Sequence, residues 1–232
     1  MPHALVIEHD PTIHLGNLEP VLRERGFDIT VVDARSADFS TINVTDADLV
    51  IILGNDSGVY EQDRLPYISA EQDWVAQRLD AHAPTLGVCF GAQIMAGALG
   101  SKVYAGPDVE LGFRNVEPTE AGKNSPVRFF AHVPVMQWHG DTFELPAGAT
   151  RLAQSSTYDN QAFALGNWGL AIQFHPEMTP EMHQVWLADG SRTLEKLGVP
   201  AESLEEENEI YNAAMKDASE AMLHDYLDGL GF

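Results

Sequence analysis

Cysteine is almost absent from this chain of 232 residues, since Cys89 is the only one. A single cysteine cannot form an intrachain disulfide, so a fold held together by disulfides is excluded. The longest apolar runs, such as LVIIL at 49–53, are far too short to span a bilayer, and the first ten residues lack the basic and apolar segments of a secretion signal. We therefore expect a cytoplasmic protein with no membrane partner.

Basic residues are also scarce: 13 Lys and Arg stand against 35 Asp and Glu, which gives a formal net charge of −22. Such a surface repels phosphate groups and anionic lipids, which argues against nucleic-acid and membrane partners. The acids are spread along the whole chain, and 44% of the residues are hydrophobic, which favours a folded core. The charge is typical either of a halophilic surface adapted to high salt or of an ordinary acidic enzyme.

Short apolar runs alternate with helix-like segments in the first hundred residues. Strands are expected at 4–10, 27–34, 47–54 and 85–88, and helices at 15–26, about 68–82 and 92–100. This alternation predicts an α/β fold with a doubly wound, mostly parallel sheet. After residue 100, strand-like pieces are divided by Gly, Pro, Asn and Asp, among them VELGFRNVEP (109–118), PVRFFAHVP (126–134) and VMQWHGDTF (135–143). They predict antiparallel strands added at one edge of the sheet.

Helical spacing returns at 179–198 and in an acidic C-terminal segment at about 199–232. In that segment a single apolar stripe can form, which would dock either on its own domain or on a partner; its members are Leu204, Tyr211, Met215, Met222 and Leu227. No internal repeat or linker marks a second domain. We therefore expect one domain over residues 1–232.

The lone cysteine lies in the sequence LGVCFGAQIM, between a predicted buried strand and a predicted helix. Gly87-x-Cys89-x-Gly91 has the form of a nucleophile elbow, because glycines lack the Cβ atoms that would clash in so sharp a turn. At the N-terminus of a helix, unpaired N–H groups and the helix dipole favour a thiolate. Free cysteine is equally often a small buried hydrophobic residue, so this motif alone leaves both interpretations open.

A proton shuttle for such a thiolate is found in QFHPEM at 173–178. Residues two apart in an extended segment face the same side, so His175 and Glu177 can point together into one site. Pro176 restricts its own φ and biases His175 towards an extended conformation. We interpret Cys89, His175 and Glu177 as nucleophile, general acid/base and orienting carboxylate.

Together the two motifs resemble the class I (triad) glutamine amidotransferases, whose elbow reads Gly-x-Cys-x-Gly-x-Gln and whose His-Pro-Glu lies near the C-terminal end. The free-standing branch that is similar to the glutaminase domain of GMP synthase fits best, on the segments at 53–61, 110–113, 138–146, 152–156 and 160–163. The resemblance implies a flavodoxin-like sheet. It also implies that Cys89 attacks the side-chain amide of glutamine, that His175 protonates the leaving ammonia, and that Glu177 holds the imidazole.

The same resemblance implies further site residues. The backbone N–H groups of Phe90 and of the turn at Gly54 and Asn55 would form an oxyanion hole. Recognition of the α-amino and α-carboxylate groups of the substrate is assigned to Gln93 and the segment His139, Gly140 and Asp141. One departure concerns the turn, because the family usually has Gly-Gly-Pro where this chain has Gly54, Asn55 and Asp56. Asn tolerates positive φ, but the Asp56 carboxylate would oppose an oxyanion unless it points away.

The sequence contains no motif typical of a metal site or a phosphate-binding loop. The spacing of the histidines and acids around 175–183 matches no zinc signature, and no phosphate-binding Gly-x-x-x-x-Gly-Lys loop is present. We expect no metal and no cofactor, and we interpret His9 and His14 as ordinary loop residues.

Three functions remain open. The first is an amidotransferase subunit that hydrolyses glutamine and supplies ammonia to a separate synthase, since the 232 residues leave no room for the ATP-pyrophosphatase domain of a GMP synthase. The second is a free-standing hydrolase of γ-glutamyl peptides or amides. The third is a module that has kept the fold only to bind γ-glutamyl ligands.

Overall fold

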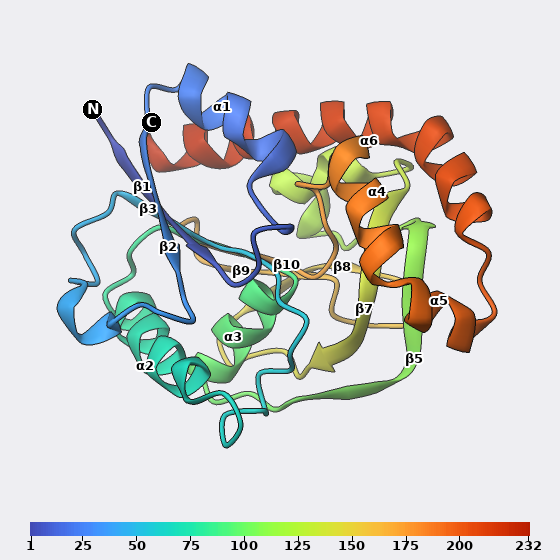
Figure 1. The fold of residues 1–232 in the computed structure, drawn as a ribbon. Helices are drawn as coiled ribbons and strands as arrows, with labels where there is room; N and C mark the ends of the chain where they lie inside the picture. Colours follow the sequence, from blue (N-terminus) through green and yellow to red (C-terminus); the bar gives the residue numbers. More distant parts are fainter.

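The computed structural model describes residues 1–232 and contains an eight-stranded sheet of order β2-β1-β3-β4-β10-β9-β8-β6 (Figure 1). The parallel part consists of β2 (Asp28–Asp33), β1 (His3–Glu8), β3 (Leu49–Ile52), β4 (Thr85–Val88) and β10 (Gly169–Ile172). The antiparallel edge consists of β9 (Ala162–Leu165), β8 (Thr150–Gln154) and β6 (Glu117–Pro118). The predicted α/β fold class, with antiparallel strands at one edge, is thereby confirmed.

Helices cover both faces of this sheet, with α1 (Glu19–Glu24) and α6 (Ala201–Leu230) on one face and α2 (Pro66–Asp80) and α3 (Phe90–Ala98) on the other (Figure 1). Successive side chains of a strand point to opposite faces, so each buried strand contributes to two cores. Val6 and Ile51 pack in the cluster that includes Met222 of α6. Ile7 and Ile52 pack in the cluster that includes Val75 of α2.

The C-terminal helix α6 docks its apolar stripe on the chain's own core. Leu204, Met215, Met222 and Leu227 are buried, and the Tyr226 hydroxyl donates to the carbonyl oxygen of Thr85 at 3.0 Å. Two shorter helices precede it, α4 (Pro180–Asp189) and α5 (Ser191–Leu197). None of the helices combines the length and apolar character that a membrane span requires. That residues 1–232 form a single domain stays a prediction.

Two local expectations were wrong. The long strands β5 (Val103–Arg114) and β7 (Val135–Phe143) do not extend the main sheet, because they pair only with each other in a separate antiparallel sheet. Residues 126–130 form a 3-10 helix rather than a strand. Ser125 caps this helix by accepting from the N–H of Val127, and Pro126 starts it where no N–H is needed. Val127 and Phe130, three residues apart, then share its buried face.

The remaining turns of 3-10 helix are Gly16–Leu18, Phe39–Thr41 and Gly122–Asn124. Gly16–Leu18 matters for the site, because it lies directly against the loop that carries His175 and Glu177.

Candidate active site

Cys89 occupies a sharp turn between β4 and α3. Its φ is 53°, in a region that residues with a side chain seldom adopt, and it directly precedes the first residue of α3. A Cβ atom on Gly87 would lie 2.5 Å from the carbonyl oxygen of Gly91, and one on Gly91 would lie 2.0 Å from that of Ile52. Both glycines are therefore required sterically, as the strand–turn–helix interpretation of this segment predicts.

His175 and Glu177 form a buried dyad beside this turn. His175 Nδ1 lies 2.6 Å from Glu177 Oε1, and the two residues are 3% and 0% exposed. Burial opposes the charged imidazole, but the Glu177 carboxylate and the Cys89 sulfur outweigh it and raise the pKa of His175 well above its ordinary value of 6.5. The structure thus brings together the three side chains that the two motifs single out.

The loop that carries the dyad is fixed by backbone and side-chain contacts with the N-terminal part of the chain. The backbone N–H of Asn17 donates to the carbonyl oxygen of Glu177 at 2.9 Å, and its side-chain Nδ2 donates to the carbonyl oxygen of Met178 at 2.7 Å. Gly16 has a φ of +45°, and a Cβ there would lie 1.9 Å from the carbonyl oxygen of Glu177. Close backbone contact at Gly16 therefore fixes the position of the His175–Glu177 loop.

Two buried glutamines form a chain of hydrogen bonds that ends at the Cys89 sulfur. Gln173 Nε2 donates to Cys89 Sγ at 3.6 Å, and Gln93 Nε2 donates to Gln173 Oε1 at 3.1 Å. The Gln173 amide is therefore directed at the sulfur and is itself held by Gln93. Gln93, which the resemblance assigns to substrate recognition, thus borders the pocket while its amide nitrogen is bonded to Gln173.

The groups assigned to the oxyanion hole lie on two adjacent segments. Gly54 and Asn55 lie outside every helix and strand, and their backbone N–H groups make no hydrogen bond within the chain. Phe90 is the first residue of α3, where the N–H groups of a helix have no partner within it. The turn at Gly54 lies against the dyad, because a Cβ on this glycine would be 3.2 Å from His175 Cε1. Asn55 Nδ2 donates to the Tyr67 hydroxyl at 2.9 Å, which anchors the turn that replaces Gly-Gly-Pro.

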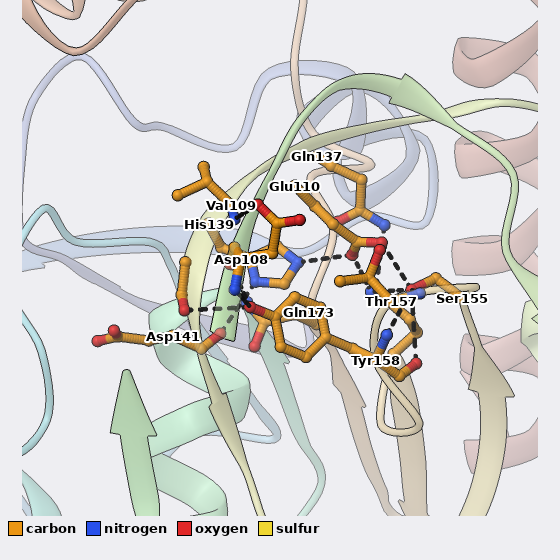
Figure 2. A network of polar contacts seen from close by, with 12 residues as sticks. Asp108, Val109, Glu110, Gln137, His139, Asp141, Ser155, Thr157, Tyr158 and Gln173 are labelled. Carbon is orange, nitrogen blue, oxygen red and sulfur yellow. Dashed lines mark hydrogen bonds and ion pairs between the residues drawn. The ribbon is translucent and has the colours of Figure 1, made fainter. Parts of the chain in front are cut away.

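A second buried carboxylate holds His139 (Figure 2). β5 and β7 pair Glu110 opposite His139, and His139 Nε2 lies 3.2 Å from Glu110 Oε2. His139 Nδ1–H donates to the carbonyl oxygen of Asp141 at 2.9 Å. Burial raises the pKa of Glu110, but hydrogen bonds from His139 and Ser155 outweigh it and lower that pKa below its ordinary value. His139 therefore borders the pocket as a ring of fixed orientation.

These residues surround one pocket of about 520 Å³, within the ~300–1,000 Å³ that is typical of ligand sites. Cys89, Gln93 and His175 line it, as do His139, Gly140 and Asp141. Its lining is acidic, because it contains neither Lys nor Arg and five carboxylates, those of Asp10, Asp56, Glu61, Asp141 and Asp189. Partial burial and the like charges of Asp10 and Asp189 raise the pKa of Asp56.

Several residues of the site belong to neither of the two sequence motifs, Gly-x-Cys-x-Gly-x-Gln and His-Pro-Glu. Gln173 shares the two-residue spacing of His175 and Glu177, so the spacing could have identified it. Trp186 packs edge-on against His175, with ring centroids 4.8 Å apart, and no sequence signal marks it. The expectation that His9 is an ordinary loop residue was wrong, because His9 is 2% exposed and its Nε2 lies 2.9 Å from Glu71 Oε2. No motif links these two residues, which are 62 positions apart.

Comparison with known proteins identifies a family. Residues 14–192 match the family model for glutamine amidotransferase class-I. The glutamine amidotransferase-like protein YfeJ of Salmonella typhimurium is 30% identical over 163 residues, which cover 68% of either chain. A crystal structure of a glutamine amidotransferase from Thermotoga maritima superposes with a TM-score of 0.88 and 30% identity over 98% of both chains.

Two further relatives are matched over smaller parts of their length. Gamma-glutamyl peptidase 5 of Arabidopsis thaliana is 32% identical over 125 residues, which are 48% of this chain and 50% of the peptidase. A GMP synthase of Vibrio atlanticus is 32% identical over 156 residues, which are 63% of this chain and 27% of the synthase. The resemblance to the GMP synthase branch is therefore confirmed in sequence.

Proposed function

Because the chain belongs to the class I glutamine amidotransferase family, we propose that it hydrolyses the side-chain amide of glutamine and releases ammonia for a separate acceptor enzyme. One observation carries this proposal: the strained Cys89 turn and the buried His175–Glu177 dyad border the same pocket. A cysteine beside a histidine that can take and return a proton, both at the edge of a cavity of ligand size, is the arrangement that acyl transfer through a thioester requires.

In the first half of the reaction, the Cys89 sulfur attacks the amide carbon and the C=O π electrons move onto oxygen. In this proposal the backbone N–H groups of Gly54, Asn55 and Phe90 bind that oxyanion, which is supported by their lack of a partner within the chain. His175, protonated on the nitrogen that faces Cys89, gives its proton to the leaving nitrogen. The C–N bond breaks, ammonia leaves, and a γ-glutamyl thioester remains on Cys89.

In the second half, water replaces ammonia. His175 takes a proton from the water as the water oxygen attacks the thioester carbon, and the C–S bond breaks to give glutamate and the thiolate. Glu177 stabilises the imidazolium in both halves through its 2.6 Å contact with Nδ1. The hydrogen bond from Gln173 to the sulfur favours the thiolate when it leaves.

A second candidate function, hydrolysis of γ-glutamyl peptides or amides, is favoured by two observations. One relative carries the name gamma-glutamyl peptidase, and the pocket has room for an acyl group with a larger amine attached. The chemistry at Cys89 would be the same, and only the leaving amine would differ. The third candidate, a module that only binds γ-glutamyl ligands, would not need the strain at Cys89.

The test is a substrate panel of glutamine and γ-glutamyl dipeptides, in which glutamate and amine release are followed for the wild type and for Cys89→Ala. We expect Cys89→Ala to lose at least about 10⁴-fold in kcat without a change in circular dichroism, because the nucleophile is removed. Diazo-oxo-norleucine should label only the wild type, since the sulfur displaces dinitrogen to form a stable thioether.

Each outcome selects one function. Release of ammonia from glutamine alone supports the amidotransferase, and faster release from dipeptides supports the peptidase. Undiminished turnover in Cys89→Ala would reject the mechanism. If the wild type binds γ-glutamyl compounds in calorimetry but releases no glutamate, the third candidate, a module that only binds such ligands, is supported.

A further inference from the structure

A second histidine–carboxylate pair lies behind the active-site turn, outside the proposed triad. His9 follows the end of β1 and Glu71 lies on α2, and they are 2% and 0% exposed. His9 Nε2 lies 2.9 and 3.1 Å from the two Glu71 oxygens. Its Nδ1 lies 3.2 Å from the carbonyl oxygen of Gly54, which can only accept, so Nδ1 carries a hydrogen and donates it to Gly54.

Helix α2 thereby supports the turn at Gly54 and Asn55 from two points. Tyr67 and Glu71 are four residues apart and lie on one face of the helix. The Tyr67 hydroxyl accepts directly from Asn55 Nδ2 at 2.9 Å, and Glu71 holds the turn through His9. Neither Gly54 nor Asn55 belongs to a helix or strand, so these side chains take the place of regular backbone pairing.

His9 also contacts the second segment that carries a proposed oxyanion donor. Its ring packs edge-on against Phe90, with centroids 4.7 Å apart and an interplanar angle of 65°. Phe90 directly follows Cys89 and opens α3. One buried ring therefore contacts both Phe90 and the carbonyl oxygen of Gly54, and Gly54 also lies close to His175.

We propose that His9 and Glu71 are positioning residues that set the distance between the Gly54–Asn55 turn and Phe90, and with it the geometry of the oxyanion hole. This inference rests on the proposed hydrolysis. It assigns a role in turnover to two residues that do not line the pocket.

A positioning role and a purely structural role predict different results for a variant that stays stable. Removing one partner of a buried hydrogen-bonded pair leaves the other polar group buried and unsatisfied, which is destabilising, whereas replacing both partners by apolar residues of similar volume is often neutral or stabilising. The double variant His9→Phe/Glu71→Met should therefore fold and melt at or above the wild-type temperature. If the pair only held the fold together, this variant would keep its activity.

The experiment compares kcat and KM for the substrate that the wild type hydrolyses. We expect kcat of His9→Phe/Glu71→Met to fall about 100-fold, the usual loss for a displaced or missing oxyanion donor, with KM within about threefold. His9→Asn/Glu71→Met restores a donor near the Gly54 carbonyl without burying a charge, and it should recover to within about tenfold of the wild type.

Arg78→Met is the matched control. Arg78 lies on the same helix and is fully buried, but it donates to the carbonyl oxygens of Ala47 and Pro84, away from the pocket. We expect it to lower the melting temperature and to leave kcat per folded molecule unchanged. Wild-type kcat in His9→Phe/Glu71→Met, or an equal loss of kcat in Arg78→Met, would overturn the inference.

Hydrogen exchange separates this inference from the proposed function. If the wild type hydrolyses none of the substrates, the proposed function fails, and exchange in the peptide covering 53–58 still tests the turn. We expect that peptide to exchange about tenfold faster in His9→Phe/Glu71→Met, and at the wild-type rate in Arg78→Met. Unchanged exchange in the double variant would show that the pair does not hold the turn.

Discussion

Replacing Glu177 by Gln removes one negative charge from the active site and keeps the shape of the side chain. Glu177 is fully buried, one of its oxygens contacts His175 Nδ1 at 2.6 Å, and the other has no hydrogen-bond partner. The Glu177 carboxylate accepts no other hydrogen bond, so the substitution acts through His175. A neutral amide cannot balance the charge of the imidazolium. If its NH₂ group turns towards Nδ1, the ring hydrogen moves to the nitrogen that faces Cys89.

The expected loss is large. In serine proteases, exchanging the carboxylate of the triad for its amide lowers kcat about 10⁴-fold, which corresponds to about 5 kcal/mol in the activation free energy. We expect a similar loss in kcat for Glu177→Gln, and about 10⁶-fold for His175→Ala. Because the two residues act as a unit, the double variant should lose about 10⁶-fold and not the product of the two single losses.

The substitution should also change the pH dependence of stability. The folded-state pKa of His175 is raised well above 6.5, so the pair's contribution to the free energy of unfolding is fully present below pH 6.5. It is lost as the pH rises through the folded-state pKa. Glu177→Gln removes the charge that raises this pKa, so the difference in stability between wild type and variant should shrink at high pH.

The assay is glutamate release in single and multiple turnover, together with urea unfolding at several pH values. Glu207→Gln is the control, because Glu207 is a carboxylate on α6 that accepts from the N–H of Phe113 at 2.8 Å and does not line the pocket. We expect this control to keep wild-type turnover. Additive losses in the Glu177/His175 cycle would refute the reasoning and assign Glu177 a separate role, such as binding substrate.

Two further predictions concern the acidic residues. Asp56→Asn should raise kcat/KM up to about fivefold, because it removes roughly 1 kcal/mol of charge repulsion at the oxyanion. The gain should grow as the pH rises through the raised pKa of Asp56, and a gain independent of pH would contradict this account. The net charge of −22 makes the acids repel one another, and salt screens this repulsion, since the Debye length falls from about 10 Å at 0.1 M to about 3 Å at 1 M. The melting temperature and the activity should therefore both rise as potassium chloride increases from 0.1 M to above 1 M. A flat or falling melting temperature would indicate an ordinary acidic enzyme.

Local sequence determined the parts of the site that depend on steric rules. Gly87 and Gly91 flank Cys89 because any Cβ atom there would overlap backbone, and this restriction is visible in the sequence before any fold is known. His175 and Glu177 share one side of an extended segment for the same kind of reason, since they are two residues apart. Periodicity over a few residues likewise determined the parallel strands and the buried stripe of α6.

Pairing between distant segments was decided only in the tertiary structure. The composition of β5 and β7 predicts strands, but whether they join the main sheet or pair with each other depends on which hydrogen-bonding edge is free. That choice places Glu110 opposite His139. A short stretch such as 126–130 is equally ambiguous, because a capping Ser125 and an apolar spacing of three residues were enough to favour a 3-10 helix over a strand.

The buried polar pairs show the physical reason most clearly. His9 and Glu71 are ordinary surface residue types, and nothing near either one in the sequence indicates burial. Burial of either alone would be costly, and it becomes tolerable only because β1, β3 and α2 bring the two side chains and the Gly54 carbonyl within hydrogen-bond distance. The sequence alone therefore determined the candidate nucleophile and its histidine and carboxylate partners. Which buried residues hold them in place was decided only in the tertiary structure, because it depends on the cost of desolvation and on contacts between distant segments.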